Sequence, residues 1–131
     1  MNRAAQIIEY VWVSAGGKLR SKTRVVHRPI HDVKELPLWN FDGSSTGQAH
    51  GRFSDVTLKP ERIYPDPFRK QHHIIVLCEC YDDHKLTTPN KHNTRQLLTS
   101  AIKGKEHHEM LSGIEQEYVF YDVKTKMPLG W

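Results

Sequence analysis

The 131-residue sequence has few cysteines and no long apolar segment. Its two cysteines, Cys78 and Cys80, are separated by one residue, a spacing at which a disulfide between them would be strained. Two thiols alone also cannot complete a tetrahedral zinc site. We therefore expect both to be reduced packing residues, as is usual inside cells.

No apolar run approaches the ~20 residues that a membrane-spanning helix requires. The apolar stretch that begins at Ile7 is interrupted by Glu9, which does not match a secretory signal peptide. These features predict a cytoplasmic protein that has no membrane partner.

Dense basic clusters are also missing, although the formal net charge is +4. The 19 Lys and Arg residues are scattered and never form a run of five. This pattern fits an ordinary solvated surface better than a nucleic-acid interface, so no nucleic-acid partner is predicted. The 9 histidines include no helical pair with the supporting acid of zinc enzymes, and no phosphate-cradling glycine motif is present.

The first segments that are rich in β-branched and aromatic residues predict a β-hairpin. Residues 7–13 and 19–26 have this composition, and the Ser-Ala-Gly-Gly sequence at 14–17 supplies the turn between them. In the second strand, Arg20, Lys22 and Arg24 recur with a period of two and would share one face.

Further along the chain, the apolar segment 73–81 predicts a central strand, whereas the glycines of 37–51 indicate a loop. A polar linker at 82–93 precedes a helix predicted over 94–103 and a strand predicted over 113–123. The residues that define this helix are the cap Asn93, the terminating Gly104 and an apolar stripe of Leu97, Leu98, Ala101 and Ile102.

The sequence therefore predicts an α+β protein with two regions. Residues 1–88 form a mostly β unit that is large enough to fold. Residues 89–131 hold one helix and one strand, which cannot bury both faces of either element, so this second region looks incomplete.

Glu115 and Glu117 are candidate metal ligands. On a strand, side chains two positions apart share a face, with their Cα atoms ~7 Å apart. Each carboxylate could hold a hard divalent cation such as Mg²⁺ or Mn²⁺, which neutralises phosphate oxygens during their transfer. The alternative is a solvated strand face that carries two acids, and spacing alone favours it.

Asp42 lies in the sequence Trp-Asn-Phe-Asp-Gly-Ser-Ser-Thr at 39–46. A carboxylate in such a loop forms an Asx-turn, accepts backbone hydrogen bonds, or binds a cation or an amine, and the turn is the more common role. Asp55 supplies a second carboxylate, toward which the loop could fold back.

Short motifs along nearly the whole sequence resemble those of glutamine synthetases of the eukaryotic type, in the same order. The main ones are Tyr10-Val11-Trp12-Val13, Trp39-Asn40-Phe41-Asp42-Gly43-Ser44-Ser45-Thr46, Asp66-Pro67-Phe68-Arg69, Val76-Leu77-Cys78-Glu79, Asn93-Thr94-Arg95, Glu115-Gln116-Glu117-Tyr118 and Pro128-Leu129-Gly130-Trp131.

The resemblance implies a β-grasp domain over residues 1–88 and the start of a catalytic domain over residues 89–131. The family makes glutamine from glutamate, ammonium and ATP through γ-glutamyl phosphate, with Mg²⁺ or Mn²⁺. It builds each active site between the N-terminal domain of one subunit and the catalytic domain of the next. The expected partners are therefore further copies of this chain or full-length synthetase subunits.

By the same resemblance, Glu115 and Glu117 would each bind one of two cations. Asp42 would bind ammonium and help remove its proton in a neighbouring subunit's site, and Asp55 matches a second acid of that loop system. The family's remaining ligands and its substrate-binding arginines lie beyond residue 131, so we expect the chain alone to be inactive. The alternative is a non-catalytic interaction module that modulates a full-length synthetase.

Two positions and one five-residue segment depart from the family pattern. Ser14 replaces a usual aspartate, and Phe53 stands where the family usually has a polar residue. The sequence Glu-Met-Leu-Ser-Gly at 109–113 replaces a His-Pro-Trp-Phe-Gly pattern. The last departure affects a contact region of the catalytic domain.

Overall fold

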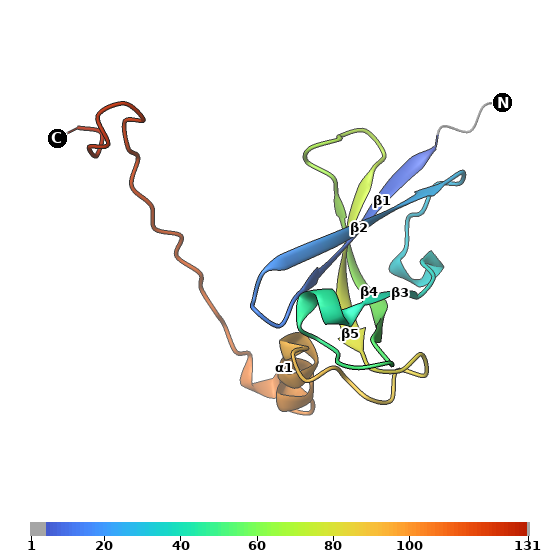
Figure 1. Cartoon of the computed structure of the whole chain (residues 1–131). Helices are drawn as coiled ribbons and strands as arrows, with labels where there is room; N and C mark the ends of the chain where they lie inside the picture. The colour runs from blue at the N-terminus through green and yellow to red at the C-terminus, as the bar shows by residue number, and fades with distance from the viewer. Residues whose placement is uncertain (1–4, 131) are drawn as a thin grey trace. The chain divides into compact units, whose positions relative to one another are not determined.

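The computed structural model describes residues 5–130. The chain divides into two compact units, Met1–Ala101 and Ile102–Trp131. The first unit contains the sheet and helix α1 as far as Ala101 (Figure 1).

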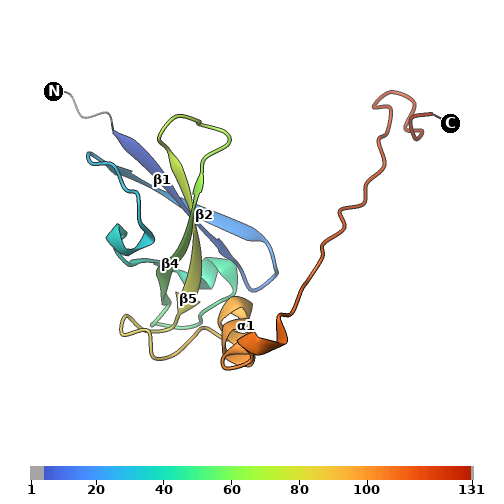
Figure 2. The same ribbon diagram turned by 180° about the vertical axis from the view of Figure 1, so that it is seen from behind.

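A five-stranded mixed sheet is the main element of the first unit (Figures 1 and 2). Its strands are β1 (Gln6–Val13), β2 (Leu19–Val26), β3 (Trp39–Asp42), β4 (Asp55–Pro65) and β5 (Ile74–Tyr81). Their order across the sheet is β2-β1-β5-β4-β3; β1 and β5 run parallel and the other neighbours are antiparallel. The helical elements are η1 (Val33–Glu35), η2 (Gly43–Thr46), α1 (Thr94–Ile102) and η3 (Glu106–His108).

The predicted hairpin and the predicted central strand are confirmed. β1 and β2 pair along their whole length, from Gln6 opposite Val26 to Val13 opposite Leu19. Gly17 in the turn between them has a φ of +74°, a conformation that glycine adopts without steric cost. β5 is the third of the five strands and pairs with β1 on one side and β4 on the other.

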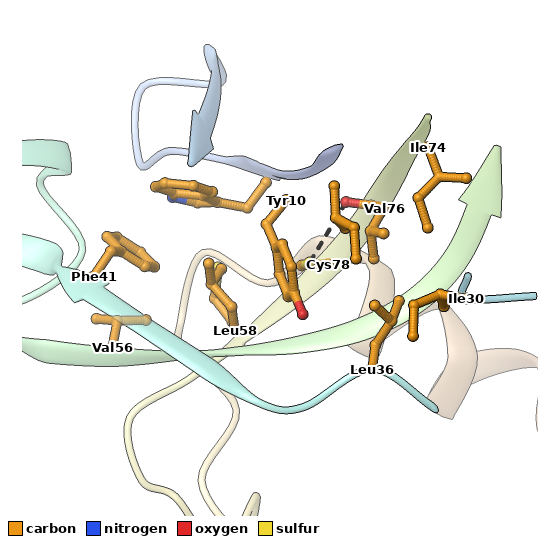
Figure 3. Packing of buried hydrophobic residues seen from close by; sticks show 12 residues of the cluster. Tyr10, Ile30, Leu36, Phe41, Val56, Leu58, Ile74, Val76 and Cys78 are labelled. Atoms are coloured by element: carbon orange, nitrogen blue, oxygen red, sulfur yellow. Dashed lines mark hydrogen bonds between the residues drawn. The ribbon is translucent and has the colours of Figure 1, made fainter. Parts of the chain in front are cut away.

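Alternate residues of the inner strands form the hydrophobic core. Tyr10 of β1, Leu58 of β4 and Val76 of β5 are each 0% exposed, and Figure 3 shows their side chains pointing into the same space. The Tyr10 hydroxyl donates a hydrogen bond to the carbonyl of Pro37 at 3.1 Å, which satisfies its polar end. Burial of each such apolar side chain contributes roughly 1.5–3 kcal/mol, so this row provides much of the stability of the unit.

The sheet curls enough for β1 to contact β3, although two strands lie between them in the sheet. The rings of Trp12 and Phe41 have centroids 4.3 Å apart, and those of Tyr10 and Trp39 are 5.3 Å apart. Trp12 and Phe41 are buried at this contact, and Trp39 is partly buried.

The loop predicted over 37–51 is wrong in part, because it contains β3 and η2. The four residues of β3 are too few for a periodic signal, and they form a strand because Phe41 packs into the core. The sequence also did not predict β4. Its Pro60 lacks an N–H, and the ladder accommodates this with an irregularity between Pro60 and Arg62.

Helix α1 confirms the prediction over 94–103, and it ends before Gly104, which has a φ of +77°. The predicted apolar stripe is wrong as a core contact, since α1 has no buried residue and Leu97 is 61% exposed. The Asn93 side chain donates to the carbonyl of Cys80 at 3.1 Å, and the backbone carbonyl of Asn93 accepts from the N–H of Leu97. None of the helices within residues 5–130 is long and apolar enough to cross a membrane.

The strand predicted over 113–123 does not form. Apart from an isolated bridge between Tyr121 and Pro128, these residues have no strand pairing. A strand needs a neighbour for its backbone hydrogen bonds, and the second unit offers none within its described residues. Its apolar side chains accordingly stay exposed, as shown by Leu111 at 98% and Ile114 at 95%.

Candidate functional site

Asp42 ends β3 and caps the helical turn η2. Its Oδ1 accepts hydrogen bonds from the hydroxyl of Ser44 at 2.7 Å and from the N–H of the same residue at 2.9 Å. The Ser44 hydroxyl, the Ser44 N–H and then Ser54 hold the pKa of Asp42 below its usual value. The predicted Asx-turn is therefore present, and the exposed side chain also presents an ionised carboxylate to solvent.

Asp55 begins β4 and lies directly opposite Asp42 in the β3–β4 ladder. Directly opposed residues of antiparallel strands have side chains on the same face, with Cα atoms roughly 4.5–5.5 Å apart. Both aspartates are exposed. The structure thus brings the two predicted acids together, which we call the Asp42–Asp55 pair.

Asp55 also lines two neighbouring hollows, with volumes of about 350 and 250 Å³. The two hollows share Phe53, Asp55 and Asp82 among their lining residues, and Asp42 lines neither. Asp83 adds a further carboxylate to the larger one. Arg52 lines the larger hollow as well, so three carboxylates face one guanidinium there, and the net negative charge favours a positively charged ligand.

Gly43 allows the turn after Asp42 to lie against β4. Its N–H donates to the carbonyl of Ser54 at 2.7 Å. A Cβ at this position would lie 2.5 Å from Cγ2 of Val56 and 2.8 Å from Cβ of Ala49. Only glycine therefore fits beside Asp42 without displacing the core residue Val56.

Two basic residues of β2, Arg20 and Lys22, bind the backbone on both sides of Asp42. The Nζ of Lys22 donates to the carbonyl of Asn40 at 2.8 Å, and Nη2 of Arg20 donates to the carbonyl of Ser45 at 3.2 Å. The sequence predicted that these side chains share a face, but it did not predict what they bind. Their acceptors are backbone carbonyls, which carry no sequence signal.

Sequence reasoning also missed Asn90, which lies within the predicted polar linker. The residue is 3% exposed, and its side chain donates to the carbonyl of Gln48 at 2.8 Å. The Pro-Asn sequence at 89–90 is a turn signal, but nothing in the sequence indicates that the asparagine is buried.

Glu115 and Glu117 lie in the second unit, in a stretch that forms neither helix nor strand, and both are exposed. Mg²⁺ prefers about six oxygen ligands in octahedral geometry. Within residues 5–130, no three or more His, Cys, Asp or Glu side chains are grouped closely enough to hold a metal ion. The described residues therefore do not fit a complete divalent-cation site.

The two cysteines are free and buried on the core face of β5. Burial raises the pKa of the Cys80 thiol to about 11 and raises that of Cys78 further. Both residues belong to the hydrophobic core cluster, which confirms that they serve in packing.

Comparison with known proteins defines the class of the first unit. Residues 4–83 match the family described as "Glutamine synthetase, beta-Grasp domain". This range includes all five strands and the Asp42–Asp55 pair. Residues 4–83 of the first unit therefore form a β-grasp domain.

The curated relatives include glutamine synthetases from two fungi and one plant that are compared with this chain as follows. That of Eremothecium gossypii is 48% identical over 129 residues, which are 98% of this chain and 34% of the relative. The Saccharomyces cerevisiae protein is 44% identical over 129 residues, 98% of this chain and 34% of the relative. "Glutamine synthetase cytosolic isozyme 1-1" of Oryza sativa subsp. japonica is 44% identical over 128 residues, 95% of this chain and 35% of the relative.

The chain belongs to the glutamine synthetase family. It spans about a third of the length of the curated relatives it matches.

Proposed function

We propose that the chain supplies the N-terminal part of a glutamine synthetase active site. The reaction is the ATP-dependent condensation of glutamate with ammonia through γ-glutamyl phosphate, in glutamine biosynthesis. The observation that carries this proposal is the Asp42–Asp55 pair, in which two exposed carboxylates oppose each other within the β-grasp domain.

The chemistry requires such a site because ammonium has no lone pair. A carboxylate must first accept a proton from ammonium. The freed nitrogen lone pair then forms the C–N bond with the acyl carbon of γ-glutamyl phosphate, and phosphate leaves with the electrons of the broken C–O bond. The nitrogen loses a second proton, which the departing phosphate can accept, and this gives the neutral amide.

Asp42 is suited to bind the ammonium ion before its proton is removed. Hydrogen bonds from Ser44 lower its pKa, so at neutral pH it is an anion that attracts ammonium. A lowered pKa favours binding of the cation over removal of its proton. Asp55, on the same face of the ladder, adds a second negative charge that stabilises the bound cation.

Glu115 and Glu117 would each give one carboxylate to one of two Mg²⁺ or Mn²⁺ ions in an assembled enzyme. Such ions, when bound, neutralise the oxygens of a transferred phosphate. Their remaining ligands, and the residues that bind ATP, would come from outside the described residues. The proposed division is a β-grasp domain over 1–88 and the start of a catalytic domain over 89–131.

The site would be completed by a neighbouring subunit, either a further copy or a full-length synthetase, in the cytoplasm. Asp42 would then act with the catalytic domain of the neighbour. The chain alone would form no glutamine, because its own described residues do not gather the metal site.

A coupled assay for ATP-dependent glutamine formation tests this proposal. The purified chain is measured alone and mixed with a full-length relative in which the residue aligned with Asp42 is alanine. We expect activity only in the mixture. Glutamine formation by the chain alone, or no activity in the mixture, would contradict the proposal.

A second candidate function is a non-catalytic module that associates with a full-length synthetase and modulates it. The observation that favours it is the contrast between the complete sheet of the first unit and the unassembled acids Glu115 and Glu117. Size-exclusion chromatography of the chain with a full-length relative tests this candidate. Separate elution of the two proteins at all mixing ratios would exclude it.

A further inference from the structure

Asn90 is buried at the end of the sheet that carries the Asp42–Asp55 pair. Its Nδ2 donates two hydrogen bonds, to the carbonyl of Gln48 at 2.8 Å and to Oδ1 of Asp82 at 2.6 Å. Its Oδ1 accepts from the N–H of His92 at 3.2 Å. The side chain is thus bonded to a backbone carbonyl, a side-chain carboxylate and a backbone N–H.

The backbone of Asn90 is itself fixed to the central strand. Its N–H donates to the carbonyl of Cys80 in β5 at 3.0 Å, and its carbonyl accepts from the N–H of Asn93 at 2.8 Å. Pro89 forms an isolated β-bridge with Tyr81. The amide of Asn90 is therefore held relative to the core.

Gln48 belongs to the turn that starts at Asp42. Its N–H donates to the carbonyl of Gly43 at 2.8 Å, which closes the turn η2. Gln48 is 4% exposed, so its carbonyl requires a hydrogen-bond donor from the protein. Asn90 provides that donor across 42 residues of sequence.

We infer that Asn90 is a positioning residue for the Asp42 carboxylate. It fixes the far end of the turn whose near end Asp42 caps. It acts through Gln48 and Gly43 rather than by contact with ammonium. The inference deepens the proposed function and depends on it for the role of Asp42.

The second bond of Asn90 has a related effect. Asp82 lines both hollows together with Asp55, and the bond from Nδ2 of Asn90 holds one of its carboxylate oxygens. Asn90 thus links a third carboxylate to the recess beside the pair. Its amide supplies two donors and an acceptor, a combination that alanine lacks and that aspartate, without a donor, cannot provide.

The test compares Asn90→Ala with Asn93→Ala in the full chain. Asn93 is a matched control, because it is also buried and also donates to a backbone carbonyl, but that carbonyl belongs to Cys80 and not to the turn. NMR measures the amide exchange of Gln48 and Ala49 and the titration of the Asp42 carboxylate.

We expect Asn90→Ala to speed exchange at Gln48 and Ala49 by about tenfold or more, the loss of roughly one hydrogen bond. The pKa of Asp42 should rise toward its usual value as the cap at Ser44 loosens. Asn93→Ala should leave the Asp42 titration unchanged, and it should speed exchange at Gln48 and Ala49 no more than at the core amides of β5, which report its loss of overall stability. Equal effects of the two substitutions would overturn the inference.

Two further outcomes keep the test decisive. If Asn90→Ala does not fold, exchange in the unchanged chain decides: Gln48 should be protected like the core amides of β5, and rapid exchange would overturn the inference. If the unchanged chain restores no activity in the mixed assay while Asn90→Ala still shifts the Asp42 titration, the positioning role stands and the proposed function fails.

Discussion

Asp66 closes the loop between β4 and β5, at the opposite end of these strands from Asp55 (Figure 1). Its Oδ1 accepts from the N–H groups of Phe68 and Arg69, at 2.9 and 3.0 Å, and Oδ2 accepts from the Arg69 guanidinium at 2.7 Å. Arg69 also donates to Glu9 of β1 at 2.7 Å. One arginine therefore ties this loop to the sheet.

The acid dependence of stability tests this role of Arg69. Its side chain is the largest cause that lowers the pKa of Asp66. Because the folded pKa lies below the unfolded value of ~3.9, the stabilisation is complete above that value and is lost as pH falls through the folded pKa. We expect Arg69→Gln to be less stable near neutral pH and to lose less stability than the unchanged chain on acidification.

Urea unfolding at several pH values measures this difference in slope. Arg62→Gln is the control, since Arg62 is an exposed arginine of β4. If Arg69→Gln and the unchanged chain lost stability in parallel on acidification, Arg69 would not be the cause of the shift.

Gly43 gives a second test at the scale of one residue. We expect Gly43→Ala to lower the free energy of unfolding by about 1–3 kcal/mol, because its Cβ would overlap Val56 and Ala49. Gly16→Ala should change it by less than about 0.5 kcal/mol, because no atom lies within 4 Å of the added Cβ. Thermal unfolding compares the two, and equal losses would contradict the close approach at Gly43.

The contrast between predicted and missed residues has a physical cause. The hydrogen bonds that Asp42 accepts are local, since Ser44 lies only two residues away, and the sequence of the turn was enough to predict them. The bond from Lys22 to Asn40 spans 18 residues and that from Asn90 to Gln48 spans 42. Such bonds depend on how the sheet curls, which no local pattern encodes.

At the scale of elements, β1, β2, β5 and α1 were predictable because each has a clear composition or periodicity. β4 was not predictable, because Pro60 and several charged residues obscure its strand pattern, although Val56 and Leu58 of this strand are buried. Segment 113–123 shows the converse: its composition favours a strand, but pairing requires a neighbour that the described residues lack.

A pair of leucine substitutions tests which elements hold the core. We expect Leu58→Ala in β4 to cost about 2–5 kcal/mol, because Leu58 is 0% exposed. Leu97→Ala in α1 should cost less than about 0.5 kcal/mol, because Leu97 is 61% exposed. Chemical unfolding measures both, and a large loss for Leu97→Ala would show that the stripe of α1 is packed in solution.

At the scale of the whole molecule, the two candidate sites differ in completeness. The Asp42–Asp55 pair stands on a folded β-grasp unit with its own core, whereas Glu115 and Glu117 lie in a unit where no metal site is gathered from the described residues. The proposed function accordingly assigns ammonium binding to the Asp42–Asp55 pair and assigns the metal-dependent chemistry to a site that several subunits complete.

The most direct measurement is the mixed assay run with two forms of this chain, unchanged and Asp42→Asn. Asparagine also caps a helical turn well, so the substitution removes the negative charge while it preserves the fold. With a full-length relative whose residue aligned with Asp42 is alanine, we predict glutamine formation with the unchanged chain and none with Asp42→Asn. Equal activity with both forms would show that Asp42 is not the residue that this chain contributes.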